Sequence, residues 1–272
     1  MATIGVFDSG CGGLSVLREL LKVLPNERYV YFADNAYCPY GEKTAAEIRA
    51  RARAITDRLL AEGADIIVVA CNTATAAAIA DLRGNYEGLR FIGMEPAVKP
   101  AALGTRSGVI GVLATAGTLK GSKYLNTKGK YEDDVKIVEH VGQGFVELVE
   151  AGDLDSPAAE AVVRASVAPL LEEGADTIVL GCTHYPFLQP LIERIAGPDV
   201  RVIDPAPAVA RHLIYVMVQE RLLSEREATL ALARVVALEN DPSGVGRPPH
   251  PDVRLLSSSA PGILEQRYRT LL

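Results

Sequence analysis

The chain has 272 residues, of which 49% are hydrophobic and 23% charged, and its formal net charge is −6. This length suits one large or two modest domains with an ample core, and the composition is that of a soluble globular protein rather than a disordered one. The acidic balance and the lack of a Lys/Arg run argue against a nucleic-acid surface, and no apolar stretch is long enough to cross a membrane. The N-terminus does not resemble a signal peptide, so we expect a cytoplasmic protein with reduced thiols.

Predicted strands alternate with predicted helices along the first half of the chain. Apolar runs predict strands at residues 4–7, 29–33, 66–70 and 91–94. A helical pattern extends to residue 23 after the first strand. Another extends to residue 61 after Thr44, which with Glu47 has the spacing of a capping box. The run at 66–70 is apolar throughout, as expected for a parallel strand that is covered on both faces.

The second half begins the same alternation again. Predicted strands lie at residues 108–115, 135–139, 177–181 and 200–203, and the first of these shares Ile-Gly-Val with the start of the chain. Helical patterns at 208–223 and 225–238 are expected to return and cover the first half. Residues 240–251 are rich in Pro and Gly, which predicts a loop, and the last twenty residues carry little pattern.

Prolines mark two crossings between the halves, at Glu95-Pro96 and within residues 204–207. We therefore expect an α/β protein of two pseudo-symmetric, doubly wound domains with mainly parallel sheets. The first domain would comprise residues 1–96 together with 208–272, and the second residues 97–207. Because ligands bind beyond the carboxyl ends of the strands in such sheets, the active site is expected in the cleft between the domains.

Two of the four cysteines occupy equivalent places in a repeated pattern. Gly63-Ala64-Asp65 is followed by a buried strand and Cys71, and Gly174-Ala175-Asp176 is followed by a buried strand and Cys182. An isolated cysteine at a strand end is often only a small apolar residue. The matched positions, each followed by polar residues, instead favour a functional pair. Cys11 and Cys38 lack this symmetry and are interpreted as packing residues.

A pair of thiols that face each other can invert a carbon centre. Removal of an α-proton needs a base on one face, and its replacement needs an acid on the other, so one thiolate and one thiol supply both roles. No C-x-x-C spacing indicates a structural zinc site, and nothing points to pyridoxal phosphate, so we expect no cofactor and no metal.

Polar residues near the cysteines are candidate helpers. Asp8 ends the first strand and could orient or deprotonate Cys71, although it could also cap the following helix. His184 could serve Cys182, and Glu150 could polarise His184, although a lone histidine is often structural and Glu150 could lie on a solvated helix face. The hydroxyls of Ser9, Thr73 and Thr183 could hold carboxylates, and the amide of Asn72 could contact an amino or a carboxyl group.

Four motifs together resemble one family. They are Asp8-Ser9-Gly10-x-Gly12-Gly13, Pro39-Tyr40-Gly41, Cys71-Asn72-Thr73-Ala74 and Cys182-Thr183-His184-Tyr185-Pro186. In this order, between about residues 4 and 210, they look like glutamate racemases of the cofactor-independent aspartate/glutamate racemase group. The resemblance implies interconversion of L- and D-glutamate, a supply of D-glutamate for peptidoglycan, and a homodimer.

The resemblance also implies residue roles. Cys71 would be the base toward D-glutamate and Cys182 the base toward L-glutamate, with Asp8 and His184 as their partners. The residues implied to line the substrate are Asp8, Ser9, Tyr40, Gly41, Asn72, Thr73, Thr183 and His184.

The chain departs from the commonest family pattern in two places. Tyr37 stands where many members have arginine, and Gly142-Gln143-Gly144-Phe145 replaces a frequent Cys-Pro-Leu-Phe run before Glu150. The second departure weakens the assignment of Glu150 and leaves both thiols in place.

Three alternatives stay open. An aspartate or hydantoin racemase would use the same chemistry, although Thr183-His184 favours glutamate. A thiol redox protein would join Cys71 and Cys182 in a disulfide, but the chain lacks C-x-x-C. A binding protein with two lobes would need no paired thiols. Inhibition of DNA gyrase, known for some family members, is a role that this sequence does not test.

Overall fold

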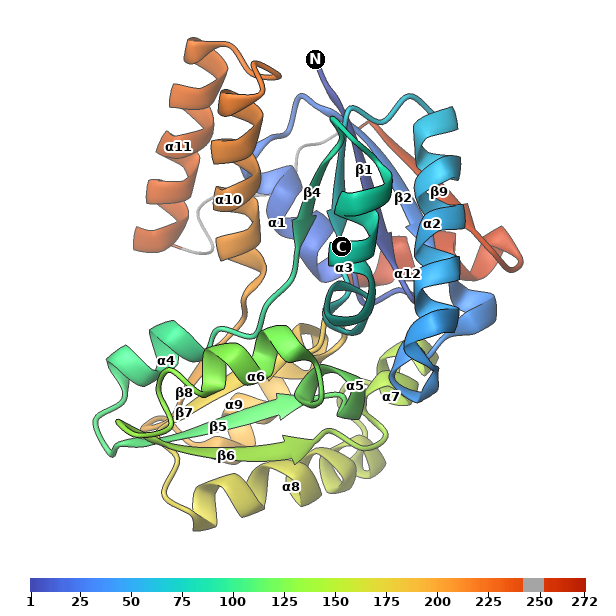
Figure 1. Ribbon diagram of the computed structural model, residues 1–272. Coiled ribbons are helices and arrows are strands. Elements are labelled where there is room, and N and C mark those ends of the chain that lie inside the picture. Colours follow the sequence, from blue (N-terminus) through green and yellow to red (C-terminus); the bar gives the residue numbers. More distant parts are fainter. Residues whose placement is uncertain (242–251) are drawn as a thin grey trace.

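The computed structural model describes residues 1–241 and 252–272 and contains two parallel sheets (Figure 1). The order in the first sheet is β4 (Arg90–Gly93), β3 (Ile66–Val69), β1 (Thr3–Asp8), β2 (Arg28–Ala33) and β9 (Val253–Ser257). The order in the second is β6 (Lys136–Val141), β5 (Val109–Ala114), β7 (Thr177–Gly181) and β8 (Arg201–Ile203). Every pairing between these strands is parallel, so the predicted fold class is confirmed.

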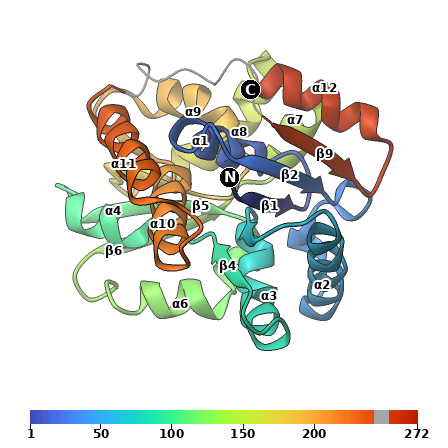
Figure 2. The ribbon, with the colours of Figure 1, turned by 90° about the horizontal axis from the view of Figure 1, so that it is seen from above.

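Helices cover both faces of the first sheet (Figure 2). One face carries α2 (Ala45–Ala61) and α3 (Asn72–Asn85). The other carries α1 (Leu14–Val23), α10 (Ala206–Gln219), α11 (Glu225–Asn240) and α12 (Pro261–Leu271). Along β1, Val6 packs toward the second group and Phe7 toward the first, because successive side chains of a strand point to opposite faces.

The second sheet is also covered on both faces. One face packs against α4 (Val98–Gly104) and α6 (Ser122–Lys128), with the short α5 (Ala116–Leu119) beside them. The other packs against α7 (Phe145–Ala151), α8 (Pro157–Glu172) and α9 (Gln189–Ala196). Three 3-10 turns complete the described elements: Asn35–Tyr37, Tyr40–Glu42 and Tyr185–Leu188.

The sequence patterns predicted the ends of most of these strands and helices to within a few residues. Thr44 caps α2 as predicted: its hydroxyl accepts from Glu47 N at 3.3 Å, and its own N–H donates to Glu47 Oε2 at 2.9 Å. The helices predicted at 208–223 and 225–238 are α10 and α11, and both pack on α1 as expected. Of the loop predicted at 240–251, Asn240 ends α11, and residues 242–251 lie outside the described residues.

The sequence pattern did not indicate β9 or α12. β9 pairs in parallel with β2, from Tyr29 opposite Val253 to Ala33 opposite Ser257. As an edge strand it is only partly buried, which explains its mixed composition. The chain passes between the sheets after β4 and after β8, near the predicted prolines, while the domain division at residues 97 and 207 stays a prediction. Within the described part of the chain, no helix is long and apolar enough to span a membrane.

Candidate active site

The carboxyl ends of strands from both sheets meet at one narrow cleft. Cys71 follows β3 and Cys182 follows β7, and both line the cleft. It is also lined by Ser9, Pro39, Tyr40, Gly41, Asn72, Thr73, Thr115, Val146, Thr183 and His184. The structure thus brings both cysteines together with most of the predicted substrate-lining residues. Asp8 and Glu150 lie directly behind this lining, in contact with Thr183 and His184.

Thr115 and Val146 are lining residues that sequence reasoning missed. Thr115 follows β5 at its carboxyl end. In the two segments that share Ile-Gly-Val, it occupies the position equivalent to Ser9. Its hydroxyl lies 2.8 Å from the hydroxyl of Thr73. The internal repeat was therefore a signal that could have found Thr115.

Cys71 is the N-cap residue of α3 and is buried. Its Sγ accepts from Ala74 N at 3.4 Å and lies 3.9 Å from Ser9 Oγ. Burial raises the pKa of the Cys71 thiol well above its usual range, and the charge of Asp8 adds to this shift. The hydrogen bond from Ala74, at the positive end of the helix, opposes it. The geometry therefore favours a protonated Cys71.

Cys182 has a different environment, a buried chain of polar contacts. His184 Nδ1 lies 3.8 Å from Cys182 Sγ, and His184 Nε2 lies 2.8 Å from Glu150 Oε1. Burial lowers the pKa of His184, but its hydrogen bonds with Cys11, Cys182 and Glu150 outweigh burial and raise the pKa well above the usual value. His184 therefore presents a charged imidazolium to the sulfur of Cys182.

Glu150 joins the two halves of the molecule. Its Oε1 accepts from the backbone N–H of Cys11 at 2.7 Å, and Arg267 Nε of α12 donates to its carbonyl oxygen at 3.0 Å. Burial raises the pKa of Glu150, but the hydrogen bond with His184 and the charge of His184 outweigh it, so the pKa is lowered. Glu150 is thus a paired carboxylate and not a solvated helix face, and its catalytic role stays a prediction.

Asp8 is buried at the end of β1. Its Oδ1 accepts from Gly10 N at 2.8 Å, and its Oδ2 accepts from Thr183 Oγ1, in the opposite half, at 3.0 Å. It does not cap the next helix, because Gly13 occupies the N-cap position of α1 and no side chain caps it. Burial raises the pKa of Asp8, against the opposing charge of His184.

Asn72 has a buried side chain whose amide nitrogen and oxygen have no hydrogen-bond partner among the described residues. Leaving buried polar atoms unpaired costs free energy, and functional sites are where such a cost is expected. A ligand with both donor and acceptor groups would satisfy this amide.

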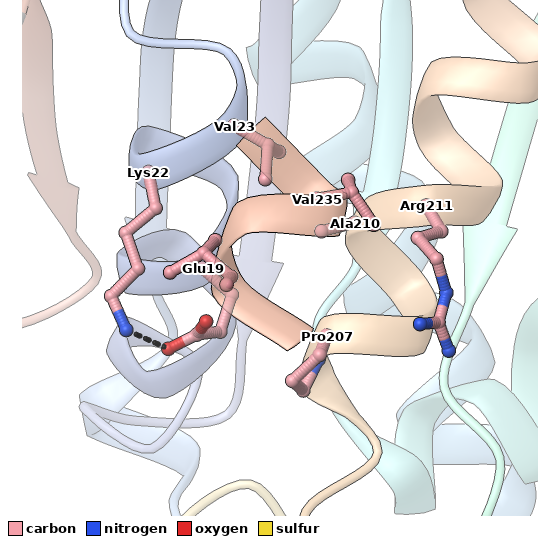
Figure 3. Close-up of a pocket in the computed structure, with 8 residues that line it drawn as sticks. Glu19, Lys22, Val23, Pro207, Ala210, Arg211 and Val235 are labelled. Atoms are coloured by element: carbon pink, nitrogen blue, oxygen red, sulfur yellow. Dashed lines mark hydrogen bonds and ion pairs between the residues drawn. The ribbon is translucent and has the colours of Figure 1, made fainter. Parts of the chain in front are cut away.

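The cleft is nearly closed. Its free volume is about 10 Å³, enough for about one water molecule and far too little for an amino acid. A larger cavity of about 260 Å³ lies between α1, α10 and α11, where Lys22 contacts Glu19 beside mainly apolar walls (Figure 3). None of the predicted site residues lines that cavity, so cavity size does not mark the active site.

One group of side chains has the composition of a metal site. In the described part of the chain, ligand atoms of Cys11, Glu150 and His184 lie within 4.8 Å of one another. C-x-x-C spacing cannot indicate this group, because its members come from three distant segments of the chain. Glu150 Oε1 is already engaged by His184 and by the backbone of Cys11, so hydrogen bonding within the protein accounts for the cluster.

Comparison with known proteins gives the family. The sequence model of the Asp/Glu/hydantoin racemase family matches residues 4–213. The chain belongs to this family. It is therefore an enzyme of the isomerase class.

Similar proteins carry a narrower name. The glutamate racemase of Ectopseudomonas mendocina is 53% identical over 84% of this chain and 86% of its own length. That of Roseiflexus sp. is 51% identical, with 88% of each chain covered.

Solved structures agree with the family assignment. A glutamate racemase from Bacillus anthracis has a TM-score of 0.79 at 28% identity, covering 99% of this chain and 93% of that one. A glutamate racemase from Francisella tularensis in complex with D-glutamate has a TM-score of 0.77 at 26% identity, covering 100% of this chain and 93% of that one.

Proposed function

We propose that the protein interconverts L- and D-glutamate, without a cofactor, by moving the α-proton between two cysteine thiols. The observation that carries the proposal is that Cys71 and Cys182, from matched positions in the two halves, line one cleft. Glutamate is favoured over aspartate because relatives of about 50% identity are glutamate racemases and because Thr183-His184 follows the second cysteine.

In the direction from L- to D-glutamate, the Cys182 thiolate takes the α-proton and becomes a thiol. The resulting carbanion then takes a proton from the Cys71 thiol on the opposite face, which leaves Cys71 as the thiolate. The environment of Cys71 supports its role as proton donor, since burial raises the pKa of its thiol, and His184 Nδ1 lies 3.8 Å from Cys182 Sγ. The reverse reaction exchanges the two roles.

The remaining predicted residues would bind or orient. Asp8 would act on Cys71, and His184, paired with Glu150, would act on Cys182. The substrate's carboxylates would meet hydroxyls and backbone amides at Ser9, Gly41, Thr73 and Thr183, with Tyr40 forming one wall of the cleft. The unpaired amide of Asn72 supports its role in substrate binding. Since the cleft is nearly closed, the halves must separate to admit glutamate.

Broader aspects follow from the family resemblance. We propose that the product D-glutamate supplies peptidoglycan synthesis in the cytoplasm, that the protein forms a homodimer, and that its domains comprise residues 1–96 with 208–272 and residues 97–207. Light scattering during size-exclusion chromatography would test the dimer.

Proton NMR of L-glutamate in deuterated water tests the mechanism. The wild type should place deuterium at the α-carbon and produce D-glutamate, and both Cys71→Ala and Cys182→Ala should lose racemisation. Cys38→Ala is the comparison variant: Cys38 does not line the cleft, and its Sγ lies 3.9 Å from Glu150 Oε1, so racemisation should be retained at a reduced rate.

Other outcomes discriminate among the alternatives. Exchange with aspartate but not glutamate would keep the mechanism and change the substrate. Exchange with no amino acid would refute the racemase proposal and favour a binding or redox protein.

A further inference from the structure

A buried carboxylate lies behind the wall of the cleft that Tyr40 forms. Asp34 follows β2 and its side chain is fully buried. Three donors reach its two oxygens: Arg51 Nε at 2.9 Å, Arg51 Nη2 at 2.8 Å and the Tyr40 hydroxyl at 2.6 Å. A buried carboxylate requires such partners, and the two parallel bonds from one guanidinium also fix its orientation.

Arg51 comes from the middle of α2 and is itself held in place. Its guanidinium carbon lies 4.0 Å from the centre of the Tyr37 ring, which is a cation–π contact. The Tyr37 ring, three residues before Tyr40, thus lies against a guanidinium that α2 supplies. Arg51 does not line the cleft, and it is not one of the proposed catalytic or substrate-binding residues.

The hydrogen bonds of Asp34 hold the turn at Tyr40 and Gly41, and this turn faces the other half of the molecule. Tyr40 and Gly41 line the cleft beside Cys71 and Asn72. A Cβ on Gly41 would lie 3.4 Å from Cβ of Thr115, so this turn packs against the start of α5. A shift of Tyr40 would therefore move a wall of the cleft and the surface on which the two halves close.

We propose that Arg51 is a positioning residue for substrate binding: acting through Asp34, it holds the Tyr40–Gly41 wall in the place that glutamate requires. This inference rests on the proposed function. Arg51 touches no reacting atom, so it affects the binding of substrate and transition state alike, and its loss changes KM rather than kcat.

Steady-state kinetics in both directions tests the proposal. Arg51→Gln should raise KM for both enantiomers by about tenfold, with kcat within about threefold of the wild type. Arg51→Lys keeps the charge but loses the bidentate geometry, so KM should rise less. The matched control is Arg53→Gln, which removes a bidentate pair with Asp81 on the exposed side of the same helix and should leave KM unchanged.

Each outcome decides the question. An unchanged KM in Arg51→Gln, or a fall in kcat with KM unchanged, overturns the positioning role. If Arg51→Gln fails to fold, as judged by circular dichroism, Arg51→Lys decides in its place, and an unchanged KM there also overturns it. A wild type that turns over neither enantiomer overturns the proposed function and this inference together, whereas an active wild type with unaffected variants overturns this inference alone.

Discussion

Replacement of Glu150 by glutamine would test the contact on which the environment of Cys182 depends. Glutamine has nearly the same shape, so the packing around α7 is preserved while the negative charge is removed. In the native protein Glu150 Oε1 accepts hydrogen bonds from His184 Nε2 at 2.8 Å and from Cys11 N at 2.7 Å. Without the charge, His184 loses one of the hydrogen-bond partners that raise its pKa, so its pKa should fall.

The size of the effect follows from the lost interaction. A hydrogen bond to a charged group contributes about 1.5–3 kcal/mol. If about 2 kcal/mol of this is lost in the transition state, kcat/KM falls by about 30-fold, because 1.36 kcal/mol corresponds to a factor of ten. The enantiomers of glutamate have equal free energies in water, so the equilibrium constant is one and kcat/KM must fall by the same factor in both directions.

Circular dichroism of the two enantiomers gives the rates directly, measured over a range of pH. Glu147→Gln is the control, since Glu147 is an exposed residue on the same helix, and it should behave as the wild type. A value of kcat/KM for Glu150→Gln within about threefold of the wild type at every pH would refute the role assigned to Glu150.

Three further variants test other parts of the site and its support. Gly12→Ala should lower kcat/KM at least about 100-fold, because the added Cβ would overlap the ring of His184 and displace it. Asn72→Leu should abolish turnover yet raise the free energy of unfolding by about 1–2 kcal/mol in urea titrations, because it removes two buried polar atoms without partners. Asp204→Asn should weaken the pH dependence of stability: burial raises the pKa of Asp204 to about 6 from 3.8. The contribution of this raised pKa to the free energy of unfolding is complete below pH 3.8 and is lost as pH rises through about 6. Between pH 4 and 7.5 the free energy of unfolding of the wild type should therefore fall by about 2 kcal/mol more than that of the variant.

Each of these variants has its own contradicting result. Gly84→Ala is the control for Gly12→Ala, because nothing lies near its added Cβ, and equal activity of the two variants would contradict the steric argument. Turnover at the wild-type rate in Asn72→Leu would remove Asn72 from the substrate site, and a lower free energy of unfolding would contradict the cost assigned to its unpaired amide. Parallel stability curves for the wild type and Asp204→Asn would show that Asp204 does not titrate as described.

Some residues of the active site could be predicted from short stretches of sequence alone. Cys71 and Cys182 were found because each follows a buried strand in the same repeated pattern, and parallel strands bring their carboxyl ends to one edge of a sheet. The motifs at Asp8-Ser9, Asn72-Thr73 and Thr183-His184 could be placed in the cleft for the same reason. By contrast, Glu150 lies on a helix in the other half from Cys11, and only the structure shows that the carboxylate oxygen in contact with His184 Nε2 also accepts a hydrogen bond from the backbone N–H of Cys11.

The amino-acid sequence by itself determined the alternation of strands and helices, the cap at Thr44, and the matched cysteines, because these depend on periodicity and on hydrogen bonds between near neighbours. The tertiary structure alone decided that β9 extends the first sheet, that Thr115 reaches Thr73, and that Arg51 meets Asp34 behind Tyr40. These contacts join distant segments, and their positions depend on how the two sheets pack and close, which no local pattern records.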